Sequence, residues 1–296
     1  ASLHGHRRGA ALFALSVILL IRVPVLYTPH GPHYAYTRGA SFLIAWCMEY
    51  AFRLVFDTVV YVSQGEQAIA QQLKLPVRGS HVVLSGLIDD PSIGEGRKPE
   101  RGTIRQELGL SPGQFVIGWI GRLHHQKGLD LLIESMPTVA AAISQVVWVV
   151  IGDGESGDLE RYRRQAAQAG MTERIRFAGG RPDARHLANA FDLYVSTSRW
   201  EGLPLALLEV MAQGVAIAAS DVVGNHDVLD GWGLLFKPND AAAAAQAQVT
   251  LARDASMRKA LTERGRSVLR ERFMLPRMLS DMDGVYGEVL GREVSV

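Results

Sequence analysis

Short apolar runs alternate along the chain with longer segments in which apolar positions recur at helical spacing. Phe115–Ile120 and Val146–Ile151 are apolar at nearly every position, which is typical of strands buried on both faces of a parallel sheet. Strands are predicted at Val25–Thr28, Thr58–Val62, His81–Leu84, Phe115–Ile120, Val146–Ile151, Ile175–Phe177, Leu193–Ser196, Ala216–Ala219 and Leu234–Phe236. Helices are predicted at Ala10–Ile21, Phe42–Phe56, Glu66–Leu73, Leu129–Ala142, Asp158–Ala169, Ala184–Ala190, Leu205–Ala212, Ala241–Arg253 and Ser256–Phe273. This alternation predicts an α/β fold with parallel sheets and helices on both faces.

The apolar run Ala10–Ile21 has two interpretations. Arg7 and Arg8 precede it, as basic residues precede the apolar part of a signal peptide. The run is too short to span a bilayer, and no small-residue cleavage site follows it. A buried helix leading into the strand Val25–Thr28 explains the same pattern, and we favour that interpretation.

The length of 296 residues exceeds what one hydrophobic core usually supports, so we expect two domains. The segment 89–102 is polar and rich in glycine and proline, which is typical of a linker. Residues 1–88 and 103–270 then form the two domains. A last helix within 271–296 is expected to return to the first domain.

Charge and composition narrow the function classes. The net charge of +1 argues neither for nor against a nucleic acid partner, but no basic stripe with interleaved aromatic residues is present, so we do not expect one. Cys47 is the single cysteine, which excludes a disulfide framework and favours a reducing compartment; we expect it to be a small buried residue. The histidines His4, His6, His33, His124 and His125 show no convincing ligand spacing, and no acidic cluster suggests a metal.

Three loops follow predicted strands, where parallel sheets bind their ligands. In "IGRLHHQKGLD", Gly121 permits a turn, and Arg122 and Lys127 precede the next helix. Such a cationic pair suits phosphate oxygens, although two solvated basic residues would give the same pattern. The glycine-rich segment "IGDGESGD", residues 151–158, is weaker evidence, because any tight turn could have this sequence.

The third loop, "EGLPLALLE", contains two acids around a Gly-Leu-Pro sequence. Pro204 suits the first position of a helix whose N-terminus would attract an anion, and Gly202 allows a close backbone approach. Glu209 lies about 7.5 Å further along the helix axis, near the offset between a diphosphate and its ribose. Glu201 precedes the helix and could bind hydroxyl groups of an attached group. Alternatively, Glu201 is a solvated or capping residue and Glu209 a surface acid.

The order and spacing of "GRL…QKG", "FAGGRPD" and "EGLPLALLE" resemble the C-terminal domain of glycosyltransferase family 4. Its members are retaining enzymes of the GT-B fold, with two Rossmann-like domains facing a cleft. The resemblance extends from about His4 to about Leu290. "VPVLYTPHG" resembles the strand and His-Gly turn of the family's first domain, and "DTVVYVSQGE" resembles its later strand and the start of the following helix.

This resemblance implies roles for individual residues. Arg122 and Lys127 would bind the donor diphosphate and stabilise it as it leaves. Glu209 would bind the ribose and Glu201 the transferred sugar, and His30 would face the reacting sugar from the first domain. The remaining donor-binding positions would be Gly121, Arg181, Pro182, Gly202, Leu203, Pro204 and Leu205. No cofactor or metal ion is expected, because basic side chains and the helix N-terminus take the metal's role.

The chain departs from the family pattern in three places. The first residues already resemble the middle of the first domain, so we expect the N-terminal domain to be incomplete. Three explanations stay open: the chain is a fragment, another chain completes the domain, or the domain is degenerate. "VVLSGLID" has Ser85-Gly86 where Asn-Gly is usual, and Asp227 stands where the family has glutamate. These differences concern the acceptor and activity more than nucleotide binding.

The resemblance implies transfer of a hexosyl group from a UDP- or GDP-sugar to a hydroxyl of a sugar, glycolipid or lipid-linked acceptor. Cell-surface polysaccharide or glycolipid synthesis would be its context, in the cytoplasm or at the inner face of a membrane. The basic, apolar start at Arg7–Ile21 is compatible with membrane contact. Two alternatives stay open: a nucleotide-sugar-binding module without activity, and another GT-B enzyme such as a sugar-nucleotide 2-epimerase.

Overall fold

The computed structural model describes residues 2–9, 12–13, 23–88 and 100–291. The chain divides into two compact units. Unit 1 comprises Ala1–Ile88, Trp200–Leu203 and Arg272–Val296, and unit 2 comprises Asp89–Arg199 and Pro204–Glu271. Among the described residues, none of the helices combines the length and the hydropathy that a membrane crossing requires.

Unit 2 contains a six-stranded parallel sheet with the order β10-β9-β8-β5-β6-β7. Its strands are β5 (Phe115–Ile120), β6 (Val146–Ile151), β7 (Ile175–Gly179), β8 (Leu193–Ser196), β9 (Ala216–Ser220) and β10 (Leu234–Phe236). β5 and β6 pair over their whole length, and nearly all their side chains are buried. The continuous apolar runs therefore form central strands, as the sequence predicted.

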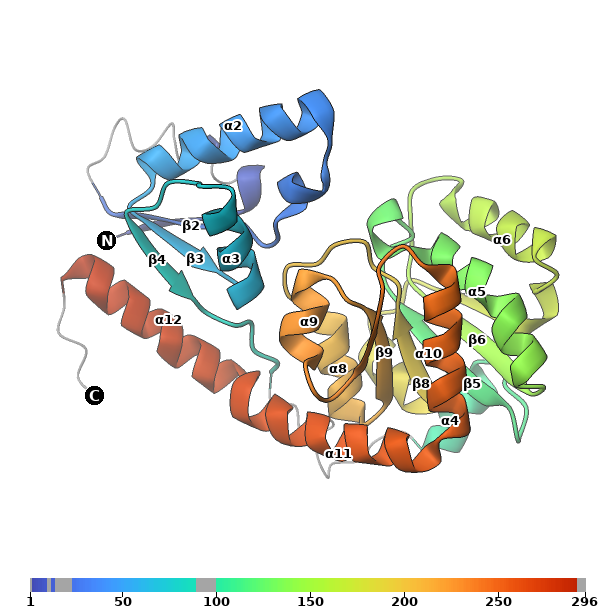
Figure 1. Cartoon of the computed structure of the whole chain (residues 1–296). Coiled ribbons are helices and arrows are strands. Elements are labelled where there is room, and N and C mark those ends of the chain that lie inside the picture. Colours follow the sequence, from blue (N-terminus) through green and yellow to red (C-terminus); the bar gives the residue numbers. More distant parts are fainter. Residues whose placement is uncertain (1, 10–11, 14–22, 89–99, 292–296) are drawn as a thin grey trace. The chain divides into compact units, whose positions relative to one another are not determined.

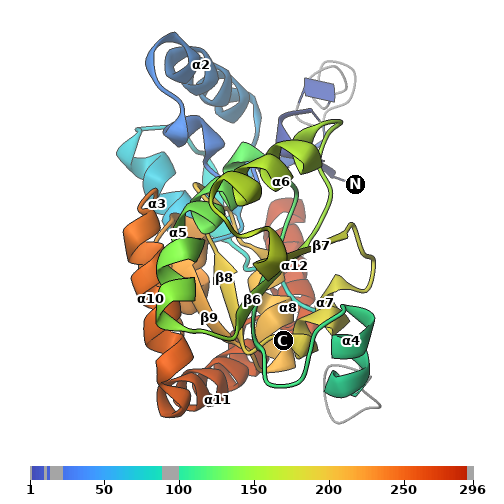
Figure 2. The same ribbon diagram turned by 90° about the vertical axis from the view of Figure 1, so that its right-hand side faces the viewer.

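Helices cover both faces of this sheet (Figure 2). They are α4 (Arg101–Glu107), α5 (Leu129–Ala142), α6 (Asp158–Gln168), α7 (Ala184–Leu187), α8 (Leu205–Gln213), α9 (Val223–Leu229), α10 (Ala241–Arg253) and α11 (Ala255–Arg272). α5 and α10 lie on one side, with α4, α7 and α8 on the other. Trp148 is fully buried in the core, and its indole N–H donates to Oε1 of Gln248 at 3.1 Å. The buried amide of Gln248 in turn donates to Ser135 Oγ, so a satisfied polar group joins α10 to α5.

Unit 1 contains a four-stranded parallel sheet with the order β1-β2-β3-β4 (Figure 1). Its elements are β1 (Leu3–His6), β2 (Val25–Thr28), η1 (His33–Tyr36), α2 (Gly39–Val55), β3 (Thr58–Tyr61), α3 (Gln64–Gln72), β4 (Gly79–Val82) and α12 (Leu275–Leu290). Tyr27 packs with Phe52 of α2, whereas Leu26 packs with Val285 of α12. Successive strand residues thus bury alternately beneath the two helices.

Several elements differ from the sequence prediction. β1 was not predicted, and β4 begins two residues earlier than the predicted strand His81–Leu84. The predicted linker 89–102 and the helix Ala10–Ile21 lie largely outside the described residues, although α4 already begins at Arg101. The helix expected within 271–296 is α12, Leu275–Leu290. It begins after residue 271 because the preceding helix, α11, continues to Arg272.

The prediction that Cys47 is buried was wrong, since it is exposed on α2. An apolar run predicts a helix but does not predict which apolar positions face the core.

Candidate functional site

The sheet of unit 2 reverses its order between β5 and β8. From β5 the chain proceeds outward through β6 and β7, and it then returns to place β8 on the other side of β5. The loops after β5 and β8 therefore leave the sheet as neighbours at its carboxyl edge. This topological switch point is where open parallel sheets bind ligands. Arg122 and Lys127 belong to the first of these loops, and the second leads to α8.

Glycines let the loops after β5 and β6 approach closely. The N–H of Gly121 donates to the carbonyl of Ile151 at 3.0 Å. Gly152 has a φ of 145°, and a Cβ there would lie 1.8 Å from the carbonyl oxygen of Gly121. The segment 151–158, which the sequence could not distinguish from an ordinary turn, thus supports the loop that carries Arg122 and Lys127.

Lys127 lies close to the turn at Gly121. It is half-buried at the end of the one-turn helix η2 (His125–Lys127), and its Cγ would lie 3.3 Å from a Cβ at Gly121. Arg122 is exposed. The structure therefore places both cations on one loop, with one side chain held against the backbone and the other in solvent.

Hydrogen bonds fasten the loop after β8 to the loop after β5. Thr197 Oγ1 donates to the carbonyl of Gly128 at 2.8 Å, and the N–H of Arg199 donates to the carbonyl of Gln126 at 2.7 Å. The Arg199 guanidinium donates to both carboxylate oxygens of Asp130, at 3.0 and 2.6 Å. Burial opposes ionisation of Asp130, but the hydrogen bonds from Arg199 outweigh it and lower the pKa of this carboxyl. These hydrogen bonds therefore hold the loop after β8 against the loop after β5.

Helix α8 begins with uncapped N–H groups. Pro204 was expected at the first helical position, but it is the N-cap, with φ −79° and ψ 104°, and no side chain caps the helix. Glu209 is half-buried on this helix. Burial raises the pKa of Glu209, and the nearby Arg185 partly offsets that effect. A half-buried acid one turn beyond an open helix N-terminus has hydrogen-bond capacity available for a ligand hydroxyl.

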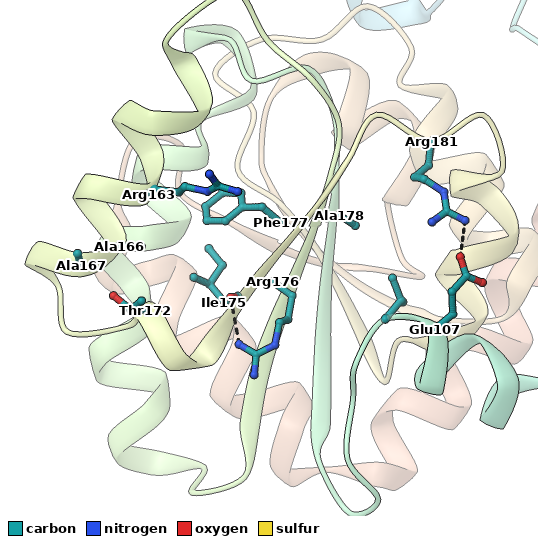
Figure 3. Close-up of a pocket in the computed structure, with 11 residues that line it drawn as sticks. Glu107, Arg163, Ala166, Ala167, Thr172, Ile175, Arg176, Phe177, Ala178 and Arg181 are labelled. Atoms are coloured by element: carbon teal, nitrogen blue, oxygen red, sulfur yellow. Dashed lines mark hydrogen bonds and ion pairs between the residues drawn. The ribbon is translucent and has the colours of Figure 1, made fainter.

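Arg181 lines a pocket of about 490 Å³ beside the edge strand β7, away from the loops after β5 and β8 (Figure 3). Its guanidinium points to Glu107, donating to Oε1 at 2.5 Å, and makes two further hydrogen bonds to Asp183. The hydrogen bonds from Asp183, then those from Glu107, raise the pKa of Arg181. The side chain is occupied by these two acids, which leaves the backbone near Pro182 as the group predicted to contact the base.

The remaining predicted residues belong to unit 1. His30 follows β2 with a φ of 62°, and Gly31 follows it with a φ of 123°. Glu201 is buried, and with Gly202 and Leu203 it belongs to the segment Trp200–Leu203. The structure thus gathers Gly121, Arg122, Lys127, Pro204, Leu205 and Glu209 at the carboxyl edge of unit 2.

Two features of the His30 turn escaped the sequence analysis. Glu66 is fully buried and accepts from the N–H of Gly31 at 2.6 Å and from the N–H of Val62 at 3.0 Å. Its spacing from Ser63, the N-cap of α3, is the capping-box pattern and was the available signal. His6 was set aside as a metal ligand, yet its Nδ1 lies 2.9 Å from Nε2 of His30.

Comparisons with known proteins place this site in a family. Residues 100–268 match the family model described as glycosyl transferases group 1. The chain is 28% identical to the lipopolysaccharide core biosynthesis mannosyltransferase LpsB of Rhizobium meliloti, over 63% of this chain and 55% of that protein. It is 30% identical to the mannosyltransferase LpcC of Rhizobium leguminosarum bv. viciae, over 61% and 53% of the two chains. The chain therefore spans about half the length of these relatives.

Solved structures show the fold. Sucrose-phosphate synthase from Thermosynechococcus elongatus superposes with a TM-score of 0.84 at 20% identity, covering 98% of this chain and 74% of that one. Anabaena HepE in complex with UDP-glucose gives a TM-score of 0.83 at 20% identity, with 97% and 78% covered. Both likenesses confirm the predicted GT-B fold. Since the family model matches more than half of the sequence, the chain belongs to the glycosyl transferases group 1 family.

Proposed function

We propose that this chain takes part in retaining transfer of a hexosyl group from a UDP- or GDP-sugar to a hydroxyl acceptor. The observation that carries the proposal is the arrangement at the switch point of unit 2. There one loop, after β5, carries Arg122 and Lys127, and the neighbouring loop, after β8, leads to the uncapped start of α8. Glu209 lies one turn further along that helix. Cations and free N–H groups suit a diphosphate, and a carboxylate accepts hydrogen bonds from a ribose diol.

The proposed roles follow from that arrangement. Arg122 and Lys127 bind the diphosphate and stabilise the charge that develops as the bond between C1 of the sugar and the phosphate oxygen breaks. The acceptor oxygen bonds to the same face of C1, and its proton passes to the leaving phosphate. Glu209 binds the ribose, Glu201 binds the transferred sugar, and His30 contacts that sugar from unit 1. The backbone at Gly121 and at Gly202–Leu205 contacts phosphate or sugar oxygens, and that at Arg181–Pro182 contacts the base.

We propose a glycolipid or lipid-linked saccharide as the acceptor, at the cytoplasmic face of a membrane. The activities of relatives support this class. Two are enzymes of lipopolysaccharide core biosynthesis, and another transfers galactose to a GlcNAc-diphosphoundecaprenol.

The two acids provide the test. Glu209→Gln should lower the affinity for UDP or GDP and for the intact nucleotide sugar alike, because both ligands contain the ribose. The expected loss is about tenfold or more, since a charged hydrogen bond contributes about 1.5–3 kcal/mol. Glu201→Gln should leave the plain diphosphate unaffected and lower kcat and kcat/KM together. Glu134→Gln, on the exposed side of α5, is the control. Isothermal titration calorimetry and release of nucleoside diphosphate measure these effects.

Each outcome has a distinct meaning. Release of diphosphate that depends on acceptor supports transfer, an altered sugar indicates an epimerase, and binding without turnover indicates a binding module. If Glu201→Gln weakens the plain diphosphate as much as Glu209→Gln does, the assigned division between the two acids is wrong.

A further inference from the structure

The carboxylate of Glu66 joins two loops at the carboxyl edge of the unit 1 sheet. The neighbouring strands β2 and β3 end at Thr28 and Tyr61. Oε1 of Glu66 accepts from the N–H of Gly31 at 2.6 Å, and Oε2 accepts from the N–H of Val62 at 3.0 Å. Gly31 lies in the loop after β2 and Val62 in the loop after β3, so each carboxylate oxygen binds a different loop.

These contacts go beyond the capping of helix α3. The helix begins at the N-cap Ser63, whose side chain accepts from the N–H of Glu66 at 3.2 Å. In a capping box the glutamate at this position reaches back to the N–H of the N-cap residue. Here the carboxylate also reaches Gly31, which lies 35 positions earlier in the chain. Formation of α3 does not require that second contact.

The turn at His30 and Gly31 needs a restraint of this kind. The φ angle is 62° at His30 and 123° at Gly31. A histidine with positive φ is strained and keeps that conformation only where the surrounding structure holds it. A hydrogen bond from a backbone N–H to a carboxylate is roughly twice as strong as one between neutral groups. The contact with Glu66 therefore holds the backbone that directs the imidazole of His30.

The same turn contacts the segment Trp200–Leu203, which belongs to unit 1. A Cβ at Gly202 would lie 2.9 Å from the N atom of Gly31 and 2.9 Å from the carbonyl oxygen of His30. Only glycine allows so close an approach of two backbones. Glu201, the neighbour of Gly202, is buried. The position of the turn therefore affects where Gly202 and Glu201 lie.

Burying the carboxylate destabilises the folded state. Glu66 is fully buried, and burial raises its pKa to about 7, although the hydrogen bonds from Val62 and Gly31 oppose that effect. A glutamine of the same size would bury no charge. Carboxylates with pKa values raised in this way are concentrated at functional sites, which favours a role for this one in the site beside it.

We propose that Glu66 is a positioning residue, which acts through the N–H of Gly31 to place His30 and Gly202 for contact with the transferred sugar. Its role in transfer rests on the proposed function, whereas the restraint on the turn does not. Because Glu66 is fully buried, it acts through the turn and not by contact with the substrate.

Amide spectra of the whole chain measure the restraint. The N–H signal of Gly31 should lie far downfield and exchange slowly with solvent. Glu66→Gln keeps the size of the side chain but offers one acceptor oxygen and an NH₂ group in place of two acceptor oxygens. The signal should then move upfield, and its exchange should accelerate about tenfold or more, as expected for the loss of one charged hydrogen bond. Gln72→Ala, at an exposed position of α3, is the control. An unchanged Gly31 signal in Glu66→Gln would overturn the proposal.

Acid should reproduce the effect of the substitution, because protonation turns one carboxylate oxygen into a donor. The Gly31 signal of the wild type should titrate near pH 7, and that of Glu66→Gln should not. The ionisable groups that face Glu66 from neighbouring elements are Arg53, Glu49, Tyr34 and Tyr61. Burial raises the pKa of both phenols, and the pKa of His30 is lowered to about 4, so none of these three groups titrates near pH 7. The same titration in both proteins would contradict the assignment.

Ligand binding distinguishes positioning from a structural role. Above pH 7, Glu66→Gln should bind UDP and GDP like the wild type, because the proposed diphosphate and ribose contacts lie in unit 2. It should lose the affinity that the sugar adds in UDP-glucose or GDP-mannose, and kcat should fall by about tenfold to a hundredfold. Urea unfolding should show no loss of stability, and a loss of activity that follows a loss of stability would refute positioning. If the wild type binds none of these nucleotides, the proposed function fails, and the Gly31 signal still decides whether Glu66 holds the turn.

Discussion

Gly152 and Gly157 offer a controlled test of the packing beneath the phosphate loop. Both have positive φ, 145° and 88°, so alanine is strained at either position. At Gly157 nothing lies within 4 Å of the added Cβ, and the backbone strain alone should cost about 1 kcal/mol. At Gly152 the Cβ would lie 1.8 Å from the backbone oxygen of Gly121, which cannot rotate away as a side chain could.

Gly152→Ala should therefore cost about 3 kcal/mol or more, from backbone strain of about 1–3 kcal/mol and overpacking of about 1–3 kcal/mol. Urea unfolding should show this loss in the transition that includes unit 2, whose core holds Trp119 and Trp148. The displaced loop carries Arg122 and Lys127, so affinity for UDP or GDP should also fall, while Gly157→Ala should bind like wild type. Equal stability of the two variants would refute the close packing of these loops.

The remaining predictions concern charge. Lys127→Ala should weaken the binding of nucleoside diphosphates by about 1.5–3 kcal/mol and leave the binding of plain nucleosides unchanged. Lys259→Ala on α11 is the control. Equal losses of affinity for both ligands in calorimetry would indicate that Lys127 acts through folding. Burial raises the pKa of Glu66 from 4.5 to about 7. A raised pKa means that the folded state disfavours the charged form, so the contribution of Glu66 to stability is greatest below pH 4.5 and falls by about 3 kcal/mol as the pH rises to about 7. Glu66→Gln should remove this slope from urea unfolding measured across pH, and a slope that persists would contradict the assignment.

The sequence predicted most of unit 2 because its strands are continuous apolar runs. β5, β6, β8 and β10 begin and end as predicted. β4 was displaced because Gly79–Val82 is only half-buried and its apolar signal is weak. α9 was missed because "VGNHDVL" mixes polar and apolar residues over only two turns. Both failures arise where pairing or packing with distant residues, rather than local pattern, selects the structure.

The candidate site shows the same limit. Glu201 belongs to the segment Trp200–Leu203 of unit 1, so its pairing with Glu209 stays a prediction. The basic pair and Glu209 could be proposed from the sequence, because one loop carries Arg122 and Lys127 and one helix carries Glu209. The support from Gly152 could not, since it depends on a contact between two separate loops, Gly152 with Gly121. Nor could the N-cap position of Pro204, because proline at the first helical position and at the N-cap give similar sequences.

His30 illustrates how sheet register creates a site that spacing cannot reveal. β1 and β2 pair in parallel with His6 opposite Thr28, so His6 is brought near a histidine that follows β2. His4, two residues earlier on the same side of β1, hydrogen-bonds to Thr28 and to Tyr286 of α12, and its ring stacks on His6. Desolvation, followed by the charges of His6 and Arg7, lowers the pKa of His30 to about 4. The imidazole of His30 is therefore neutral near pH 7, and its proposed contact with the sugar acts through a hydrogen bond and not through a positive charge.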